Sequence, residues 1–198
     1  MLKESIDEDL YNARNEVNTD PTDNQKKAGN YKMGHVTING FDITIENPKG
    51  SIRKGKDSNG NEWSVKMNND YGYFVKTKGY DGDAIDVFIG DKLESKKIFA
   101  IDQKLKGKFD ETKVMFCFDS ADEAKKAYLK NYGKNWKGFW KITEVSLPVF
   151  KKWLYDGKKQ KKPFFDYVEI INSNKKKIKI TESELRLIIK EIIQENIL

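Results

Sequence analysis

The chain has 198 residues, a length that suits one domain of ordinary size with extensions. Charged residues make up 34% of it, and its net charge is +6. Its single cysteine, Cys117, excludes an intrachain disulfide, and its single histidine, His35, leaves little material for a zinc site or a Ser-His-Asp triad. No run approaches 18 apolar residues, so we expect no transmembrane helix, and the acidic N-terminus lacks the apolar core of a secretion signal.

Residues 1–30 are predicted to form a helical arm. Asp20 followed by Pro21 is typical of a helix start, and Gly29 is typical of a helix end. The arm is acidic, whereas the lysines gather later in the chain, as in residues 158–162 and 175–177. Such lysines allow nucleic-acid binding, but solvated surface lysines are the commoner explanation.

Residues 31–156 are predicted to form the body of the protein. Runs rich in β-branched and aromatic residues predict strands over residues 35–39, 42–46, 62–67, 84–89, 98–102 and 113–118. Ser120 and Glu123 form a capping-box sequence that predicts a helix to about Asn131, and Ser146 predicts a helix over residues 147–154. Short strands at this spacing favour a mainly β or α+β fold, a small barrel or a sandwich.

The remaining residues are predicted to form a tail in two parts. Residues 157–173 are expected to be a Lys-rich linker, over 157–163, and an extended segment, in which residues 164–171 form an edge strand or remain merely extended. Residues 174–198 are expected to form an amphipathic helix that begins at the capping box of Thr181 and Glu184. Its apolar stripe consists of Leu185, Ile188, Ile189, Ile192 and Ile193. A helix this short is marginal alone in water, so the stripe must pack on its own domain, on a partner chain or on a second copy.

The segment Asp81-Gly-Asp83-Ala-Ile-Asp86-Val87 carries the strongest chemical signal. Clustered carboxylates repel one another unless cations are bound, and Mg²⁺ is usually held by a few carboxylates together with substrate phosphates. An EF-hand calcium loop does not fit, because Asp86 and Lys92 occupy its sixth and twelfth positions. Asp-Gly-Asp alone would more often be a turn, so the interpretation as a metal site depends on the surrounding residues.

Those surroundings contain the groups that phosphoanhydride hydrolysis needs. Metals must neutralise the substrate and lower the pKa of the attacking water, carboxylates must hold the metals, and Lys, Arg and Tyr must hold phosphate oxygens. Each residue taken singly would usually be a surface charge or a core aromatic, so only the joint pattern is informative. The set comprises Glu46, Arg53, Lys66, Tyr71, Tyr73, Asp102, Asp110, Glu111 and Lys113.

Five segments of the chain resemble segments of the family I soluble inorganic pyrophosphatases and follow one another in the same order as in that family. The Asp81–Val87 segment resembles that family's D-G-D-P-x-D-V signature. The other four segments are Ile45-Glu46-Asn-Pro48 for I-E-x-P, Asp70-Tyr71-Gly-Tyr73 for N-Y-G-Y, Glu111-Thr-Lys113 for D-x-K, and Tyr132-Gly-Lys134 for a Tyr-Lys pair. A closer resemblance is carried by residues 28–31, 45–50, 108–114 and 136–138. It covers about residues 20–155 and is to the pyrophosphatase-like domain of bacteriophage and prophage proteins, including polyvalent ones.

The resemblance implies an OB-like five-stranded barrel flanked by helices, and Mg²⁺-dependent hydrolysis of pyrophosphate with two or more Mg²⁺ or Mn²⁺ ions. It implies a metal site at Asp81, Asp83 and Asp86, with Asp83 as the general base. The implied metal set continues with Asp102 and Glu111, with Asp110 as a substitute and Glu46 at outer positions. The implied phosphate-binding groups are Arg53, Lys66, Lys113, Tyr71 and Tyr132. A phage or prophage protein would act in the cytoplasm of the infected cell or in the virion.

Four departures from the family pattern bear on activity. Lys66 replaces the usual Arg, so a bidentate fork becomes a point charge, and Glu111 is one methylene longer than the usual Asp. Gly133 splits the Tyr-Lys pair, and Gly55 stands near Arg53 where the family carries a carboxylate. These departures leave two alternatives open. One is a metal-dependent phosphohydrolase that acts on a nucleotide or a nucleic acid, and the other is a catalytically weakened scaffold that serves as a virion or interaction module.

Overall fold

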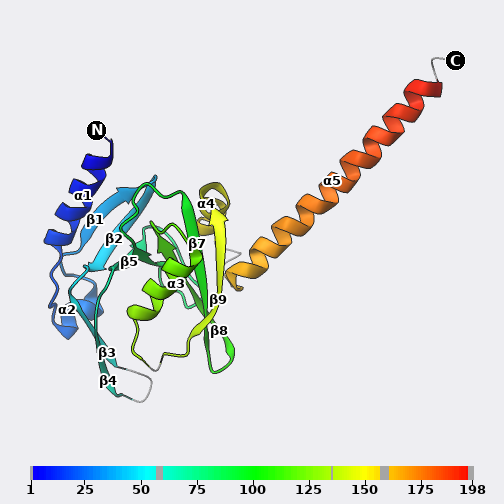
Figure 1. The fold of residues 1–198 in the computed structure, drawn as a ribbon. Coiled ribbons are helices and arrows are strands. Elements are labelled where there is room, and N and C mark those ends of the chain that lie inside the picture. Colours follow the sequence, from blue (N-terminus) through cyan, green and yellow to red (C-terminus); the bar gives the residue numbers. More distant parts are fainter. Residues whose placement is uncertain (1, 57–59, 135, 157–160, 196–198) are drawn as a thin grey trace. The chain divides into compact units, whose positions relative to one another are not determined.

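The computed structural model describes residues 2–56, 60–134, 136–156 and 161–195. The chain divides into two compact units, Met1–Phe164 and Phe165–Leu198 (Figure 1). The first unit holds every strand of the described chain, and the second consists of most of one helix.

A seven-stranded mixed sheet is the centre of the first unit. Its spatial order is β1 (Gly34–Ile38), β2 (Phe41–Asn47), β5 (Asp70–Phe74), β6 (Asp86–Ile89), β8 (Lys108–Phe116), β7 (Lys97–Leu105) and β9 (Phe139–Ser146). Only β6 and β8 pair in parallel. A separate hairpin consists of β3 (Ile52–Lys56) and β4 (Glu62–Lys66). The α+β class is confirmed, but the expected closed five-stranded barrel is wrong for the described residues, because β1 and β9 end the sheet as unpaired edges.

Three strands were not predicted: β3, β5 and β9. The segment of β5 contains Gly72, a residue that usually weakens a strand. Its backbone approaches β2 so closely that an added Cβ at position 72 would lie 1.8 Å from the carbonyl oxygen of Thr44. Glycine is thus required here by the pairing of two strands distant in sequence, which local propensity does not reveal.

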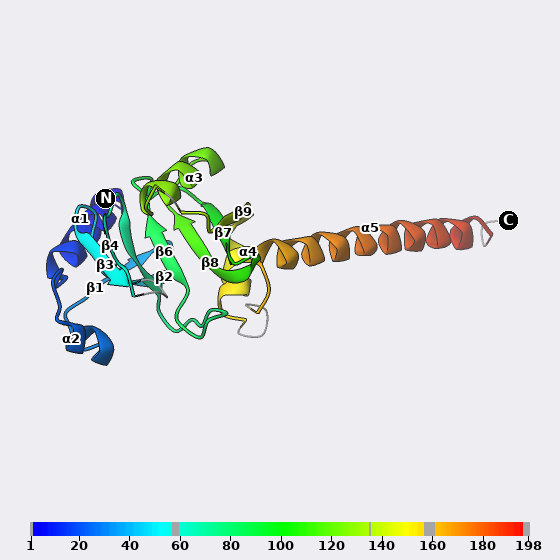
Figure 2. The ribbon, with the colours of Figure 1, turned by 90° about the horizontal axis from the view of Figure 1, so that it is seen from below.

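Helices cover both faces of the sheet, as Figure 2 shows for α3 (Ala121–Lys130) and α4 (Leu147–Leu154). Tyr128 of α3 packs with Phe88 and Met115, on what we call the α3 face. Phe150 of α4 packs with Phe41 and Phe74 on the opposite face, the α4 face, where both rings also contact Phe116. Because side chains alternate along a strand, adjacent residues of β8 serve opposite faces.

The predicted helix caps are confirmed in part. The Ser120 hydroxyl accepts the N–H of Glu123 at 3.2 Å and begins α3. Gly29 ends α2 (Asp23–Ala28) in the left-handed conformation at φ 63°, as predicted. The start of α2 lies at Thr22 rather than Asp20, because Thr22 forms the reciprocal capping box with Gln25. α4 is confirmed, although Ser146 makes no capping hydrogen bond.

The N-terminal helix α1 (Leu2–Glu16) packs on β1 within the first unit. Leu10 and Ala13 are buried, and an added Cβ at Gly34 would lie 2.0 Å from the Ala13 carbonyl oxygen. Arg14 at the helix end donates through Nε and Nη2 to the fully buried carboxylate of Asp70 at 2.6–2.9 Å. The arm is therefore joined to β5 by a charged pair as well as by apolar contacts.

A single helix, α5 (Phe164–Glu195), occupies the C-terminal region. The predicted edge strand over residues 164–171 is wrong, and the helix begins well before Thr181. Aromatic and β-branched residues favoured a strand, but Phe164 is instead buried edge-to-face against Trp153 at the first position of the helix. Residues 157–160 of the predicted linker lie outside the described residues. Within the described chain, no helix is long and apolar enough to cross a membrane.

Cys117 is expected to be chemically inert in the folded protein. Its side chain is fully buried, and burial raises the pKa of the thiol to about 12, so almost no thiolate exists near neutral pH. A disulfide-exchange reagent at pH 8 should therefore label no cysteine in the native chain and one cysteine per chain in guanidinium chloride. Rapid labelling of the native protein would contradict this expectation.

Candidate active site

Asp86, Tyr71 and Lys113 form the centre of a charged cluster on the α3 face. Tyr71 donates its hydroxyl proton to Asp86 Oδ2 at 2.5 Å, and the ammonium of Lys113 pairs with the same oxygen. Lys113 also pairs with Glu111, two residues earlier on β8, at 2.6 Å. Three adjacent strands thus supply these groups, because β6 pairs with both β5 and β8.

Arg53 reaches this cluster from the β3–β4 hairpin. Its Nη2 donates to the Tyr71 hydroxyl at 3.0 Å, and its guanidinium carbon lies 4.1 Å from the centre of the Tyr71 ring. On the hairpin itself the guanidinium lies 5.4 Å from the ring of Trp63. Aromatic contacts therefore hold a cation that keeps further N–H donors for an anion.

Glu46 lies within electrostatic range of the same groups at the end of β2. Burial, together with the negative charge of Asp86, raises the pKa of Glu46, while the charges of Arg53 and Lys113 oppose the shift. Tyr31 donates to Glu46 Oε1 at 3.3 Å. Burial first, and the neighbouring carboxylate second, raise the pKa of Tyr31 to about 12, so its hydroxyl keeps its proton.

Tyr132 joins the cluster from the segment that follows α3. Burial raises the pKa of Tyr132, and the positive charges of Lys113 and Arg53 act in the opposite direction. Gln103, which is buried on β7, donates through Nε2 to the hydroxyls of both Tyr132 and Tyr128, at 2.8 Å and 2.7 Å. Since the Tyr132 oxygen accepts from Gln103, its own proton can be donated toward an anion.

Asp81 and Asp83 lie on the exposed loop before β6. The N–H of Asp83 donates to Asp81 Oδ1 at 3.1 Å, and Gly82 between them adopts φ 99°, which favours glycine. The charge of Asp81 is one cause of the raised pKa of Glu111, after burial and the charge of Asp86. This effect on Glu111 relates the Asp81 carboxylate to the cluster.

Three predicted site residues are not brought to the cluster. Lys66 is exposed on β4. No hydrogen bond or ion pair described for Asp110 joins it to the cluster, and it lies where the pairing of β8 with β7 is irregular. Asp102 is fully buried on the α4 face, where its Oδ1 accepts the Thr112 hydroxyl at 2.6 Å and the Phe164 N–H at 2.8 Å. Asp102 therefore ties β7 to the first residue of α5.

Sequence reasoning did not identify Gln103, Tyr31 or Trp63. Gln103 is a polar residue within the mostly buried strand β7, and its polarity was the one feature of the sequence that could have identified it as a site residue. Trp63 crosses the hairpin over Gly55, where an added Cβ would lie 2.4 Å from the indole. The position at which a carboxylate was expected therefore holds a glycine that makes room for an aromatic ring.

The donor chemistry of the cluster fits a hard divalent cation. Glu46, Asp86 and Glu111 are oxygen donors, and the charge of Asp86 raises the pKa of both glutamates, which indicates mutual repulsion. Within the described residues, no three Asp, Glu, His or Cys side chains converge in a metal-holding group. Lys113 and Arg53 are the cations that balance the carboxylates in this arrangement.

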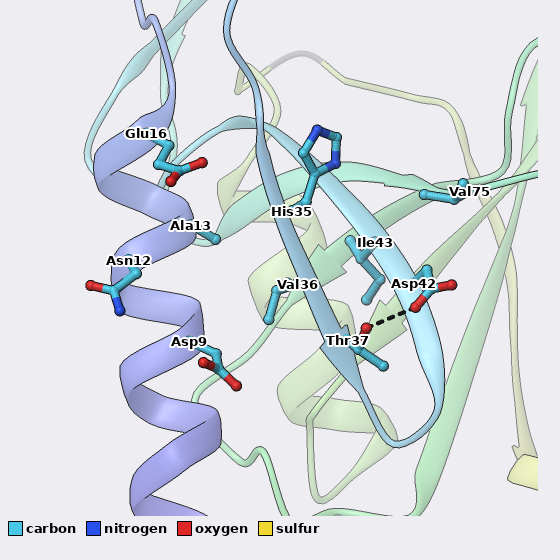
Figure 3. Close-up of a pocket in the computed structure, with 10 residues that line it drawn as sticks. All are labelled: Asp9, Asn12, Ala13, Glu16, His35, Val36, Thr37, Asp42, Ile43 and Val75. Atoms are coloured by element: carbon cyan, nitrogen blue, oxygen red, sulfur yellow. Dashed lines mark hydrogen bonds between the residues drawn. The ribbon is translucent and has the colours of Figure 1, made fainter.

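A separate hollow of about 430 Å³ lies between α1 and the outer strands β1 and β2 (Figure 3). Acidic and polar side chains line much of it, including Asp9, Glu16, His35 and Asp42. Thr37 and Asp42 hydrogen-bond to each other across the two strands at 2.7 Å. None of the predicted site residues lines this hollow, so its chemistry is distinct from that of the Asp86 cluster.

Comparison with protein families identifies a match over most of the chain. The family model for inorganic pyrophosphatase matches residues 23–155, from the first residue of α2 to the residue after α4. Comparison with curated proteins gives no match. The matched region contains the whole sheet, the hairpin and all the residues of the Asp86 cluster, while α1 and α5 lie outside it. The chain belongs to the inorganic pyrophosphatase family.

Proposed function

We propose that the chain hydrolyses inorganic pyrophosphate to two phosphates with the help of divalent metal ions. The observation that supports this most strongly is the cluster around Asp86, in which carboxylates, cations and phenols from β5, β6 and β8 meet on one face of the sheet. A phosphoanhydride carries several charged oxygens that need such donors, while its hydrolysis needs a water and a base.

The phosphate oxygens are bound by Arg53, Lys113, Tyr71 and Tyr132 in this proposal. Arg53 is held between two aromatic rings, so little side-chain freedom is lost when it binds an anion. Lys113 is buried and already within reach of two carboxylates, and it can exchange one of them for a phosphate oxygen. Lys66 is left out of this group because its side chain is exposed and no contact described for it joins it to the cluster.

Metal ions would be held by Asp81, Asp86 and Glu111, with Glu46 nearby. Mg²⁺ bound there supplies charge neutralisation and a lowered pKa for the attacking water. Asp83 would accept a proton from the attacking water as the water oxygen bonds to phosphorus. The bridging P–O bond would break at the same time and release the second phosphate. Asp102 is not part of this set, because its carboxylate is occupied by Thr112 and Phe164 on the other face.

Phosphate release from pyrophosphate tests the proposal. With Mg²⁺ the purified chain should release two phosphates per pyrophosphate, and a chelator should abolish the release. A nucleoside triphosphate assayed in parallel should be hydrolysed far more slowly. The proposal would be overturned if protein shown to be folded by circular dichroism released no phosphate from pyrophosphate with Mg²⁺ or Mn²⁺. Faster phosphate release from the nucleotide would instead identify the nucleotide as the substrate.

A further inference from the structure

Helix α5 carries a seven-residue repeat that the proposed active site does not use. Ile171, Ile178, Leu185 and Ile192 follow one another at intervals of seven within Phe164–Glu195. A strict seven-residue repeat drifts slowly around a straight helix and stays on one side only when two helices wind around each other with a left-handed supercoil. The spacing is therefore typical of a coiled-coil seam, in which these four residues occupy the a positions.

Among the side chains that the structure describes on α5, aliphatic residues on and beside this seam are open to solvent. Leu185, an a position, is 56% exposed, and Ile189, an e position beside the seam, is 49% exposed. Asn174, Thr181 and Ile188 occupy the intervening d positions. Of the exposed aliphatic side chains described on α5, Ile170, Leu185 and Ile189 lie on or beside the seam, and Leu187 lies away from it. Such a bias toward one side is a feature of helices that pair with another helix.

We propose that α5 pairs in parallel with α5 of a second copy of this chain. In a parallel pair each a position meets itself, which gives apolar layers at Ile178, Leu185 and Ile192. An antiparallel pair that keeps the same overlap would place Leu185 opposite Thr181 and Ile192 opposite Asn174. The parallel alignment thus places these apolar side chains against one another, whereas the antiparallel alignment places Leu185 and Ile192 against polar ones.

The charges beside the seam agree with the parallel alignment. Lys177 occupies a g position and Glu182 the following e position, five residues later. A parallel pair places Lys177 beside Glu182 of the second copy, and the symmetry of the pair makes this contact twice. Lys176 and Lys179 occupy the outer f and b positions, and Lys175, at an e position, would lie beside Ile170 of the second copy rather than beside a lysine.

The mass of the full-length chain in solution tests the pairing. Sedimentation equilibrium should give twice the chain mass of 23.0 kDa for the wild type, and a single-chain mass for Leu185→Lys combined with Ile192→Lys. Leu187→Lys is the matched control, because Leu187 is 61% exposed but occupies the c position, away from the seam. It should remain a dimer. A wild-type chain that is monomeric at 100 µM, or a dimer that survives the double substitution, would overturn the proposal.

Cross-linking through a cysteine introduced at the seam tests the parallel alignment. This test does not require that the lysine variants fold. Leu185→Cys should form a disulfide between two copies under mild oxidation, whereas Leu187→Cys should not, and the buried Cys117 should not interfere. A dimer in which Leu185→Cys does not cross-link would overturn the parallel alignment. The pairing does not rest on the proposed activity, so phosphate release should be unchanged in all of these variants.

Discussion

Phosphate release from pyrophosphate is expected to fall by about 10²–10⁴-fold when Asp83 is replaced by asparagine, the range that general-base catalysis contributes. Asparagine keeps the size and the backbone of the Asp81–Asp83 turn, in which the residue 83 N–H bonds to Asp81. It cannot accept a proton from water at neutral pH. The loss should therefore appear in kcat, with KM for pyrophosphate changed little, in an initial-rate assay with Mg²⁺.

Asp91→Asn is the matched control for this change. Asp91 is also an exposed aspartate, but its carboxylate pairs with Lys49 at 2.9 Å outside the Asp86 cluster. We expect its phosphate release to equal that of the wild type. If Asp83→Asn kept most of the wild-type rate, Asp83 would not be the base. If both variants lost activity equally, the loss would reflect surface charge rather than proton transfer.

Replacement of Arg14 by alanine is expected to lower the free energy of unfolding by about 3–5 kcal/mol. Asp70 is fully buried, and two nitrogens of Arg14 bind its carboxylate, so the substitution leaves a buried charge without its counter-ion. The N–H of Lys49 is a remaining donor to Asp70, which compensates only in part. Denaturation in urea, followed by circular dichroism, measures the difference.

A second substitution, at Asp70, separates charge burial from lost packing. Asp70→Asn in an Arg14→Ala background removes the buried charge and keeps an oxygen for the Lys49 N–H, so the double variant should be more stable than Arg14→Ala alone. Lys56→Ala breaks an exposed ion pair with Glu62 and should cost less than about 1 kcal/mol. An Arg14→Ala effect as small as that of Lys56→Ala would show that the pair contributes little.

Local chemistry made some of the fold predictable and tertiary contacts decided the rest. The caps at Ser120 and Gly29 depend on a few neighbouring residues, and both were predicted. The strand through Gly72 depends on the backbone of β2, and the helical state of residues 164–171 depends on contacts such as that of Phe164 with Trp153. Neither contact can be predicted from the residues that neighbour Gly72 or Phe164 in the sequence.

Strand register limits what sequence motifs reveal of the site. Glu111 and Lys113 share a face because they are two residues apart, and the structure brings both to Asp86. Asp102 pairs with Thr112, the residue between them, and so points to the other face. The motif order could supply candidate residues, but the alignment of β7 with β8 was needed to separate Asp102 from the cluster.

The close contact of Gly55 with Trp63 constrains how this hairpin can change during evolution. An acidic side chain at position 55 would require the indole to leave, and the indole is one of the two rings that flank Arg53. A lineage that acquired a carboxylate there would pass through an intermediate with either a steric clash or a less constrained arginine. The two positions are therefore epistatic, and a variant library that samples both together should recover combinations that single substitutions do not.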